Sequence, residues 1–312
     1  MRVQVGRALG RAEDGIATRR GTLVLLAVAL AVYGIESIAL PVIPGRDFGT
    51  YLRFYVQMWD WHSVWPMTML FRTPLAPLVV GASLDLVGGW GAQVVMACLF
   101  AVSIAAWSRA ALALGRRSAL LTAAALLLYP GYGILFHELS SDAVCAAAFA
   151  LFGFLLSRAM VRPTARGFAF AGLGIAASAL ARPGNQVLIV LAVAPLLLAV
   201  PWRRRIVYAA SLAATAVALL GAWAVSNGLR YDDYAIARGG QAYLPFFRAF
   251  TRDHTVGPEN GEASRELARA IQRYVLPYEP YRSYGVDLES FFARGSDREF
   301  EDVIGLSDRV WG

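Results

Sequence analysis

Residues 22–43 read TLVLLAVALAVYGIESIALPVI, and this apolar stretch decides the fold class of the chain. A helix of about 20 such residues is long enough to span a bilayer. Five arginines precede it: Arg2, Arg7, Arg11, Arg19 and Arg20. No small-residue cleavage site stands out after it, so we predict a retained first membrane span rather than a removed signal peptide.

The composition favours a membrane protein over a soluble one. Hydrophobic residues make up 57% of the 312 residues and charged residues 16%, and the mean hydropathy is +0.50. A soluble domain is about half apolar and a quarter charged. We expect an all-α polytopic membrane protein with a cytoplasmic tail at 1–21, a transmembrane domain at 22–226 that includes a first external loop at 44–89, and an extracytoplasmic polar segment at 227–312.

Six further apolar runs bring the expected number of transmembrane helices to about seven. They are Trp90–Ala110, Ser118–Leu135, Ala143–Ala159, Gly167–Ala181, Asn185–Val200 and Ile206–Val225. We expect helices because an isolated segment in lipid must satisfy its own backbone hydrogen bonds, and no alternation indicates a barrel. Cys98 and Cys145 fall inside apolar runs, so we interpret them as packing residues rather than a disulfide.

The arginines decide how the ambiguous segment Met67–Val87 is interpreted. All 29 basic residues are arginines, and they flank apolar runs instead of forming one basic face, which argues against a nucleic-acid partner. If Met67–Val87 does not span, fourteen arginines share the N-terminal side, and four lie in the external loops between spans: Arg46, Arg53, Arg72 and Arg182. Counting it as a span moves nine of the fourteen outside, against the positive-inside rule. We therefore predict juxtamembrane helix there, and a multi-pass cell-membrane protein with a cytoplasmic N-terminus.

Carboxylates are also one-sided on this topology. Only Glu13 and Asp14 fall inside, whereas six fall at the external face: Glu36, Asp47, Asp60, Asp85, Glu138 and Asp142. Acidic residues contribute little to topology, so this asymmetry points to function.

Asp47 is the candidate catalytic residue, in the loop sequence Pro44-Gly45-Arg46-Asp47-Phe48. A carboxylate at the outer end of the first span could act as a general base on an acceptor hydroxyl that enters from outside. The alternative is an Arg46–Asp47 ion pair that anchors the helix end.

Arg72 and Arg182 are candidate ligands of a phosphate. Arg72 lies in Phe71-Arg72-Thr73-Pro74-Leu75, and Arg182 lies in the turn Arg182-Pro183-Gly184-Asn185 between two apolar runs. The guanidinium fork suits a phosphate. The alternative is that both side chains snorkel along apolar surface.

Glu138 and Asp142 are candidate metal ligands in His137-Glu138-Leu139-Ser140-Ser141-Asp142. Two carboxylates and an imidazole at a membrane mouth could hold a divalent cation such as Mg²⁺ or Mn²⁺. The alternative is that Asp142 caps the following span.

The polar segment at 227–312 contains two predicted helices. The first is Ser264–Leu276 with Ser264 as N-cap, and the second is Ser296–Val303. The chain then ends at Gly312 without a closing element, so we expect it to be a fragment of a longer membrane protein.

In their order and sidedness, these motifs resemble the GT-C class of membrane glycosyltransferases, in particular the branch that contains protein O-mannosyltransferases and lipid A aminoarabinose transferases. The resemblance covers residues 20 to about 230. It implies that Asp47 is the catalytic carboxylate and that Arg46, Arg72, Glu138, Asp142 and Arg182 bind substrate. It also implies a sugar donor carried on a polyprenyl phosphate, transfer with inversion, and an extracytoplasmic acceptor that is a protein, a lipid or a glycan. Arg72-Thr73 departs from the His/Lys-Pro-Pro-Leu-type motif of that branch.

Two other functions stay open. A transporter or flippase of an envelope precursor is favoured by the helix breaks Pro130-Gly131 and Pro183-Gly184. Against it, the carboxylates cluster at one face and the two halves show no repeat. The other is a non-catalytic partner in an envelope-assembly complex.

Overall fold

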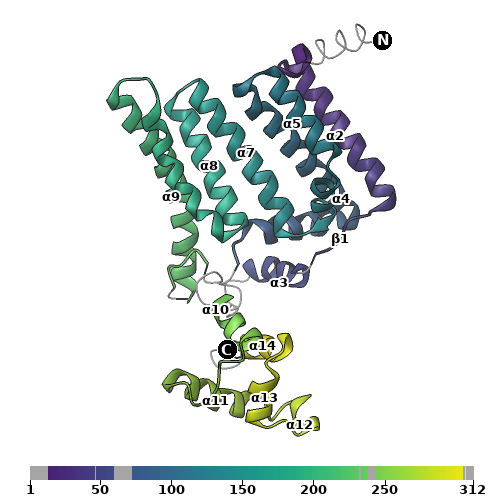
Figure 1. The fold of residues 1–312 in the computed structure, drawn as a ribbon, viewed down its shortest axis with the longest axis vertical. Helices are drawn as coiled ribbons and strands as arrows, with labels where there is room; N and C mark the ends of the chain where they lie inside the picture. The colour runs from purple at the N-terminus through teal and green to yellow at the C-terminus, as the bar shows by residue number, and fades with distance from the viewer. Residues whose placement is uncertain are drawn as a thin grey trace. The chain divides into compact units, whose positions relative to one another are not determined.

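The computed structural model describes residues 13–45, 47–59, 72–231, 233–237, 244–304 and 306. The regular secondary structure of that part of the chain is helical apart from one pair of two-residue strands, in agreement with the predicted all-α class (Figure 1). The described residues form two compact units. The first comprises the described residues up to Trp59 together with Thr73–Trp223, and the second comprises Arg72 and the described residues from Ala224 onward.

The first unit is a bundle of helices joined by short connections (Figure 1). Its elements are α2 (Arg19–Ala39), β1 (Ile43–Pro44), α3 (Phe48–Met58), α4 (Leu75–Ala111), the 3₁₀ turn η2 (Leu112–Leu114), α5 (Arg116–Leu128), α6 (Pro130–Leu135), β2 (Glu138–Leu139), α7 (Ser141–Val161), α8 (Ala165–Ala181), the 3₁₀ helix η3 (Pro183–Leu197) and α9 (Trp202–Tyr231), which continues into the second unit. Threonine N-caps start two of these helices. Thr18 Oγ1 accepts from Gly21 N–H at 2.9 Å, and Thr164 Oγ1 from Gly167 N–H at 3.0 Å.

Within the part of the chain that the structure describes, four helices are long and apolar enough to cross a membrane. They are α2, the continuous stretch Leu75–Leu114, α7 and Trp202–Arg230. The helices α8 and η3 are apolar but have only 17 and 15 residues. All six downstream runs predicted as spans are helical, although Ser118–Leu135 is broken into α5 and α6 before Pro130. These lengths and compositions are those of an all-α membrane protein.

A break in α4 separates a short first part from a longer second part. A straight helix of 37 residues would be about 55 Å long, nearly twice the thickness of a hydrocarbon core. Gly88 interrupts it with φ +67° and ψ −157°, a backbone conformation that suits glycine. The break falls between the predicted juxtamembrane segment Met67–Val87, of which residues 67–71 lie outside the described part, and the predicted span Trp90–Ala110.

The helix η3 has an unusual backbone for an apolar segment of its length. It is a 3₁₀ helix of 15 residues, whereas 3₁₀ runs longer than four residues are uncommon. At about 2.0 Å per residue it extends about 30 Å, the thickness of the hydrocarbon core. An α-helix of the same 15 residues would reach only about 22 Å. The 3₁₀ form therefore explains how a run this short connects the two ends of the bundle.

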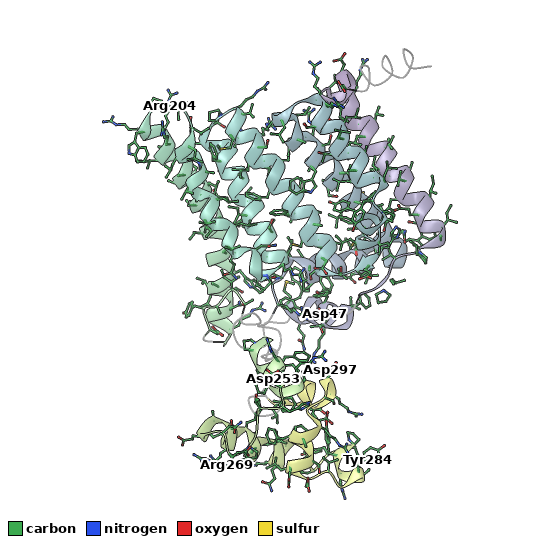
Figure 2. The ribbon with its side chains drawn as sticks, in the orientation of Figure 1. Asp47, Arg204, Asp253, Arg269, Tyr284 and Asp297 are labelled. Carbon is green, nitrogen blue, oxygen red and sulfur yellow. The ribbon has the colours of Figure 1, made fainter. Side chains whose placement is uncertain are left out.

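Arg204 and Asp47 mark opposite ends of the first unit (Figure 2). Arg116 forms an ion pair with Asp14, which places the start of α5 beside the N-terminal residues. Arg204 lies at that end and Asp47 lies at the other (Figure 2). This arrangement agrees with the predicted sidedness, in which Arg116 and the N-terminus share a side.

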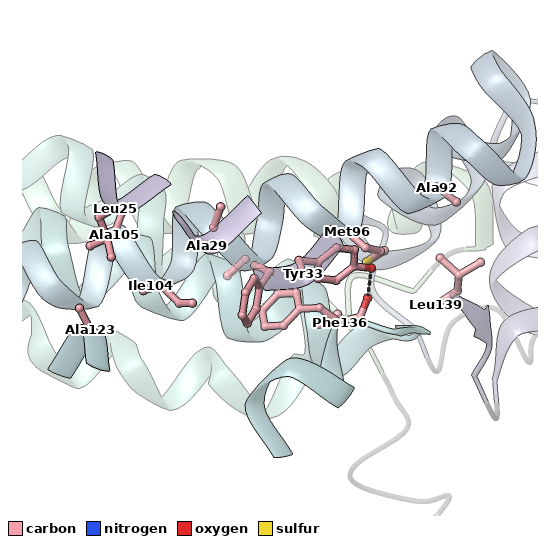
Figure 3. Close-up of a cluster of buried hydrophobic side chains, with 14 of the residues drawn as sticks. Leu25, Ala29, Tyr33, Ala92, Met96, Ile104, Ala105, Ala123, Phe136 and Leu139 are labelled. Carbon is pink, nitrogen blue, oxygen red and sulfur yellow. Dashed lines mark hydrogen bonds between the residues drawn. The ribbon is translucent and has the colours of Figure 1, made fainter. Parts of the chain in front are cut away.

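The core of the first unit joins α2 and α4 to the segment before β2. Tyr33 of α2 is buried, and its hydroxyl donates to the Phe136 carbonyl at 2.9 Å (Figure 3). The ring of Phe100 on α4 lies 5.7 Å from that of Tyr33 and 5.5 Å from that of Phe136. A helix in lipid gains little hydrophobic free energy by packing on protein, so close contacts and buried hydrogen bonds of this kind hold the bundle together.

The second unit has an aromatic core. Its elements beyond α9 are α10 (Leu244–Phe247), the π-helical turn η5 (Arg248–Arg252), α11 (Glu262–Tyr274), α12 (Tyr281–Tyr284), α13 (Leu288–Arg294) and α14 (Asp297–Ile304). Phe250, Phe291 and Phe300 are almost completely buried there. Both predicted helices are present, as α11 and α14. The predicted cap at Ser264 is wrong. The N-cap is Gly261, three residues earlier, with φ +124°, and α11 begins at Glu262.

Candidate functional site

A short parallel bridge joins the two predicted external loops. Ile43 pairs with Glu138 and Pro44 with Leu139, although the paired residues are far apart in the sequence. Ile43 N–H donates to the His137 carbonyl at 2.9 Å. The bridge brings the loop that contains Asp47 against the loop that leads into α7.

Asp47 and Asp142 occupy equivalent places after this bridge, each three residues beyond its paired strand. Asp47 is the residue before α3, and its side chain makes no capping hydrogen bond to that helix. Asp142 lies in the first turn of α7, where a carboxylate is favoured by the helix dipole. The N-cap of α7 is Ser140, two residues before Asp142, so the alternative in which Asp142 itself caps the span is wrong.

The loops approach closely at Gly45. A Cβ there would lie 2.9 Å from the Leu139 carbonyl oxygen and 3.1 Å from Ser140 Cβ. Any larger residue would push the two loops apart, two residues before Asp47.

A cleft of about 410 Å³ opens beside the start of α7. Its lining residues are Leu135, Asp142, Cys145, Ala146, Phe149, Arg182 and Asn185. The cleft is shallow and open rather than enclosed. The polar groups come from the first turn of α7 and from the α8–η3 connection, whereas the remainder of the lining is mainly apolar.

Arg182 and Asp142 form an ion pair in this cleft. The side chains remain 59% and 46% exposed, so water screens the pair and its contribution to stability is at most about 1 kcal/mol. One guanidinium N–H reaches Asp142, and a guanidinium has five N–H donors in all. The geometry therefore suits an Arg182 that is oriented by Asp142 and available to a ligand.

The start of α4 packs against the same region. Ala76, Val144 and Ala181 form one buried cluster, with Leu75 and Cys145 packed around it. The end of the Phe71–Leu75 motif thus lies beside the start of α7 and the end of α8.

The other predicted site residues fall in different places. Glu138 is exposed on β2. Arg72 is partly buried and belongs to the second unit. Arg46 lies outside the described residues. The phosphate-binding roles of Arg46 and Arg72 stay predictions.

The predicted three-residue cation site is not assembled. His137 is only 4% exposed and stacks on Tyr33, with ring centroids 4.3 Å apart and planes 3° apart. Neighbouring residues of an extended chain point to opposite faces, so His137 turns inward and Glu138 outward. Among the described residues, no group of three or more His, Cys, Asp or Glu could hold a metal ion. A site made by Glu138 and Asp142 without the imidazole stays a prediction.

Burial changes the acid–base behaviour of His137. Removal of the ring from water lowers the pKa of the imidazole, and the nearby Glu36 carboxylate offsets part of that effect. His137 Nε2 lies 3.6 Å from Glu36 Oε2. The neutral ring is therefore favoured in the folded protein.

Sequence reasoning missed Cys145 and Asn185. Cys145, predicted to be a packing residue, is a free thiol in the wall of the cleft. Asn185 Nδ2 donates to Cys145 Sγ at 3.0 Å and to the Ser178 carbonyl at 3.1 Å. The available signal was an asparagine at the start of an apolar run, directly after the Arg-Pro-Gly turn.

Comparison of the chain with protein-family models, with curated proteins and with solved structures found no match.

Proposed function

We propose that the protein is a membrane glycosyltransferase that moves a sugar from a polyprenyl-phosphate donor to an acceptor outside the cytoplasm. In this proposal the bundle crosses the membrane about seven times, with α5 and α6 together, α8 and η3 adding to the four long helices. The arginine-rich end is then cytoplasmic by the positive-inside rule, and the end with Asp47 faces outward.

The observation that carries the proposal is the convergence of loop motifs at one end of the first unit. The β1–β2 bridge joins the Asp47 loop to the Glu138 loop. The start of α4 and the end of α8 pack on the start of α7. Motifs separated by up to about 140 residues thus form one region, as a shared active site requires.

The cleft also suits an amphiphilic donor. Arg182 and Asp142 provide a charged mouth, and Phe149 lies seven residues further along α7, about 10 Å away. A phosphate at Arg182 would leave an isoprenoid chain free to follow the apolar wall.

The proposed reaction is an inverting transfer with Asp47 as general base. Asp47 accepts the proton of the acceptor hydroxyl, whose oxygen attacks the anomeric carbon of the sugar. The bond from that carbon to the phosphate oxygen breaks, and polyprenyl phosphate leaves with the bonding electrons. Arg182 stabilises the negative charge on the leaving phosphate.

Two further contributions remain part of the proposal. Arg46 and Arg72 are proposed as additional phosphate ligands. Glu138 with Asp142 is proposed to orient the substrate or to bind a divalent cation, which would neutralise phosphate charge when present.

The test is donor turnover by the purified full chain in detergent or membranes. Extracted polyprenyl-phosphate sugars are incubated with the wild type, with Asp47→Asn and with Asp14→Asn, and loss of donor is followed by mass spectrometry. Asp14 is a matched control because it lies at the opposite end of the first unit, in an exposed ion pair. Loss of a general base lowers turnover by about 10²–10⁴-fold. We expect that loss for Asp47→Asn and unchanged turnover for Asp14→Asn.

The other outcomes separate the alternatives. Equal turnover by all three proteins would remove Asp47 from the mechanism and keep the transferase class. Donor that binds but is never consumed, with binding lost in Arg182→Ala, would favour a transporter or flippase. No binding and no turnover with any donor would favour a non-catalytic partner.

A further inference from the structure

The imidazole of His137 is buried and poorly hydrogen-bonded. It is 4% exposed, neither ring nitrogen has a partner at good hydrogen-bond distance, and Nε2 lies 3.6 Å from the Glu36 carboxylate. A buried polar group that lacks good hydrogen bonds destabilises the folded protein. Its ring nevertheless lies flat on Tyr33, with the centroids 4.3 Å apart. The stacking on Tyr33 fixes the position of the His137 ring against α2.

Glu36 also contacts the His137 ring. Its Oε2 atom lies 3.6 Å from His137 Nε2. A Cβ added at Gly133 would lie only 2.7 Å from the same oxygen. The carboxylate is therefore close to both the imidazole and the backbone of α6. We call Tyr33, Glu36, Gly133 and His137 the α2 clamp.

The α2 clamp connects to Asp47 through the backbone. The His137 carbonyl accepts Ile43 N–H at 2.9 Å, and Val42 N–H donates to Gln93 Oε1 at 3.1 Å. Two residues after Ile43, Gly45 packs on the Leu139 carbonyl. A shift of His137 is thereby passed to the residues that lead directly into Asp47.

We propose that His137 is a positioning residue, which acts through the β1–β2 bridge to hold the Asp47 loop in its working place. The role in catalysis rests on the proposed transferase function, whereas the role in ordering the loop does not. A misplacement of about 1 Å at a catalytic group can lower a rate by 10²-fold, so a small shift at the bridge is sufficient.

The kinetic test compares four variants of the full chain. His137→Ala removes the ring, His137→Phe keeps a ring that can stack on Tyr33, and Gly133→Ala displaces Glu36 without removing a functional group. Gly34→Ala is the matched control, because a Cβ there meets nothing within 4 Å on the same helix as Glu36. We expect kcat to fall by about 10–100-fold in His137→Ala and Gly133→Ala. We expect a smaller loss in His137→Phe, no loss in Gly34→Ala, and KM for the donor within about twofold throughout, since the cleft is untouched.

A second measurement does not depend on the proposed function. Hydrogen exchange of a peptide covering residues 40–48 should accelerate in His137→Ala and Gly133→Ala, because Val42 and Ile43 lose protected amides, and should not change in Gly34→Ala. Unchanged exchange in the first two variants would overturn the inference whatever the protein catalyses. Accelerated exchange with unchanged kcat would overturn the catalytic role. A wild type that consumes no donor would defeat the proposed function, and exchange would still decide whether the clamp orders the loop.

Discussion

Gly172 offers the sharpest test of helix packing in the first unit. This glycine of α8 faces α9 so closely that a Cβ would lie 2.4 Å from the Leu212 carbonyl oxygen and 3.0 Å from Thr215 Cβ. Carbon and oxygen normally approach no closer than about 3.3 Å, so Gly172→Ala forces the helices about 1 Å apart. Overpacking of this kind costs about 1–3 kcal/mol, and the better helix propensity of alanine returns up to about 1 kcal/mol.

The matched variant is Gly221→Ala on α9, where a Cβ meets nothing within 4 Å. Only the propensity gain applies there, about 0.5–1 kcal/mol. For domains of 150–250 residues, 1 kcal/mol shifts Tm by about 2–4 °C. Thermal unfolding of the full chain in detergent, followed by tryptophan fluorescence, should therefore show a lower Tm for Gly172→Ala and an equal or higher Tm for Gly221→Ala. Equal shifts of the two variants, or a gain in Tm for Gly172→Ala, would refute the close contact of α8 and α9.

Three further predictions test other parts of the chain. Five alanines inserted in the middle of η3 (Pro183–Leu197) should be tolerated, with Tm changed by no more than about 4 °C. The reason is that 20 residues of α-helix have the same length, roughly 30 Å, as 15 residues of 3₁₀ helix. A drop in Tm as large as the one that the same insertion causes in α7 would contradict this prediction. Asp142→Asn should change the free energy of unfolding by less than about 1 kcal/mol, because the side chains of Asp142 and Arg182 are 46% and 59% exposed and water screens their ion pair; urea unfolding measures this change. Asp287 caps α13 and accepts a hydrogen bond from Ser290 N–H, which lowers the pKa of the Asp287 carboxyl. The cap therefore stabilises the folded protein above the ordinary pKa of aspartate, and this stabilisation is lost as the pH falls below about 4. Asp287→Ala should accordingly lower Tm at pH 7, and the difference in Tm between the two proteins should shrink as the pH falls below about 4; a difference that does not shrink would argue against a charged cap.

Much of the fold could be predicted from the sequence because lipid leaves few choices. Apolar runs must form helices to satisfy their backbones, and arginines bias one side of each connection. The same reasoning separated Met67–Val87 from the span that follows, near the break at Gly88. Helix type and boundaries were less predictable: η3 is a 3₁₀ helix, and α11 starts at Glu262 because Gly261 adopts a positive φ.

The candidate site could be predicted only as separate parts. Asp142 and Arg182 were both identified from local motifs, but their pairing depends on how α7 and α8 lie together. His137 and Glu138 are adjacent in the sequence and have opposite surroundings, because an extended chain alternates its faces and only the position of α2 decides which face is covered.

The sequence by itself determined the chemical character of each end of the bundle. Charges in a membrane protein lie mainly in the connections between spans, and the bias of arginines toward one side can be read directly from the order of residues. Only the tertiary structure decided which connections meet. The β1–β2 bridge, the α2 clamp and the cleft at Asp142 are contacts between segments that no local pattern relates. Their energies come from close packing and from a few buried hydrogen bonds, which depend on the relative positions of helices rather than on the residues of any one of them.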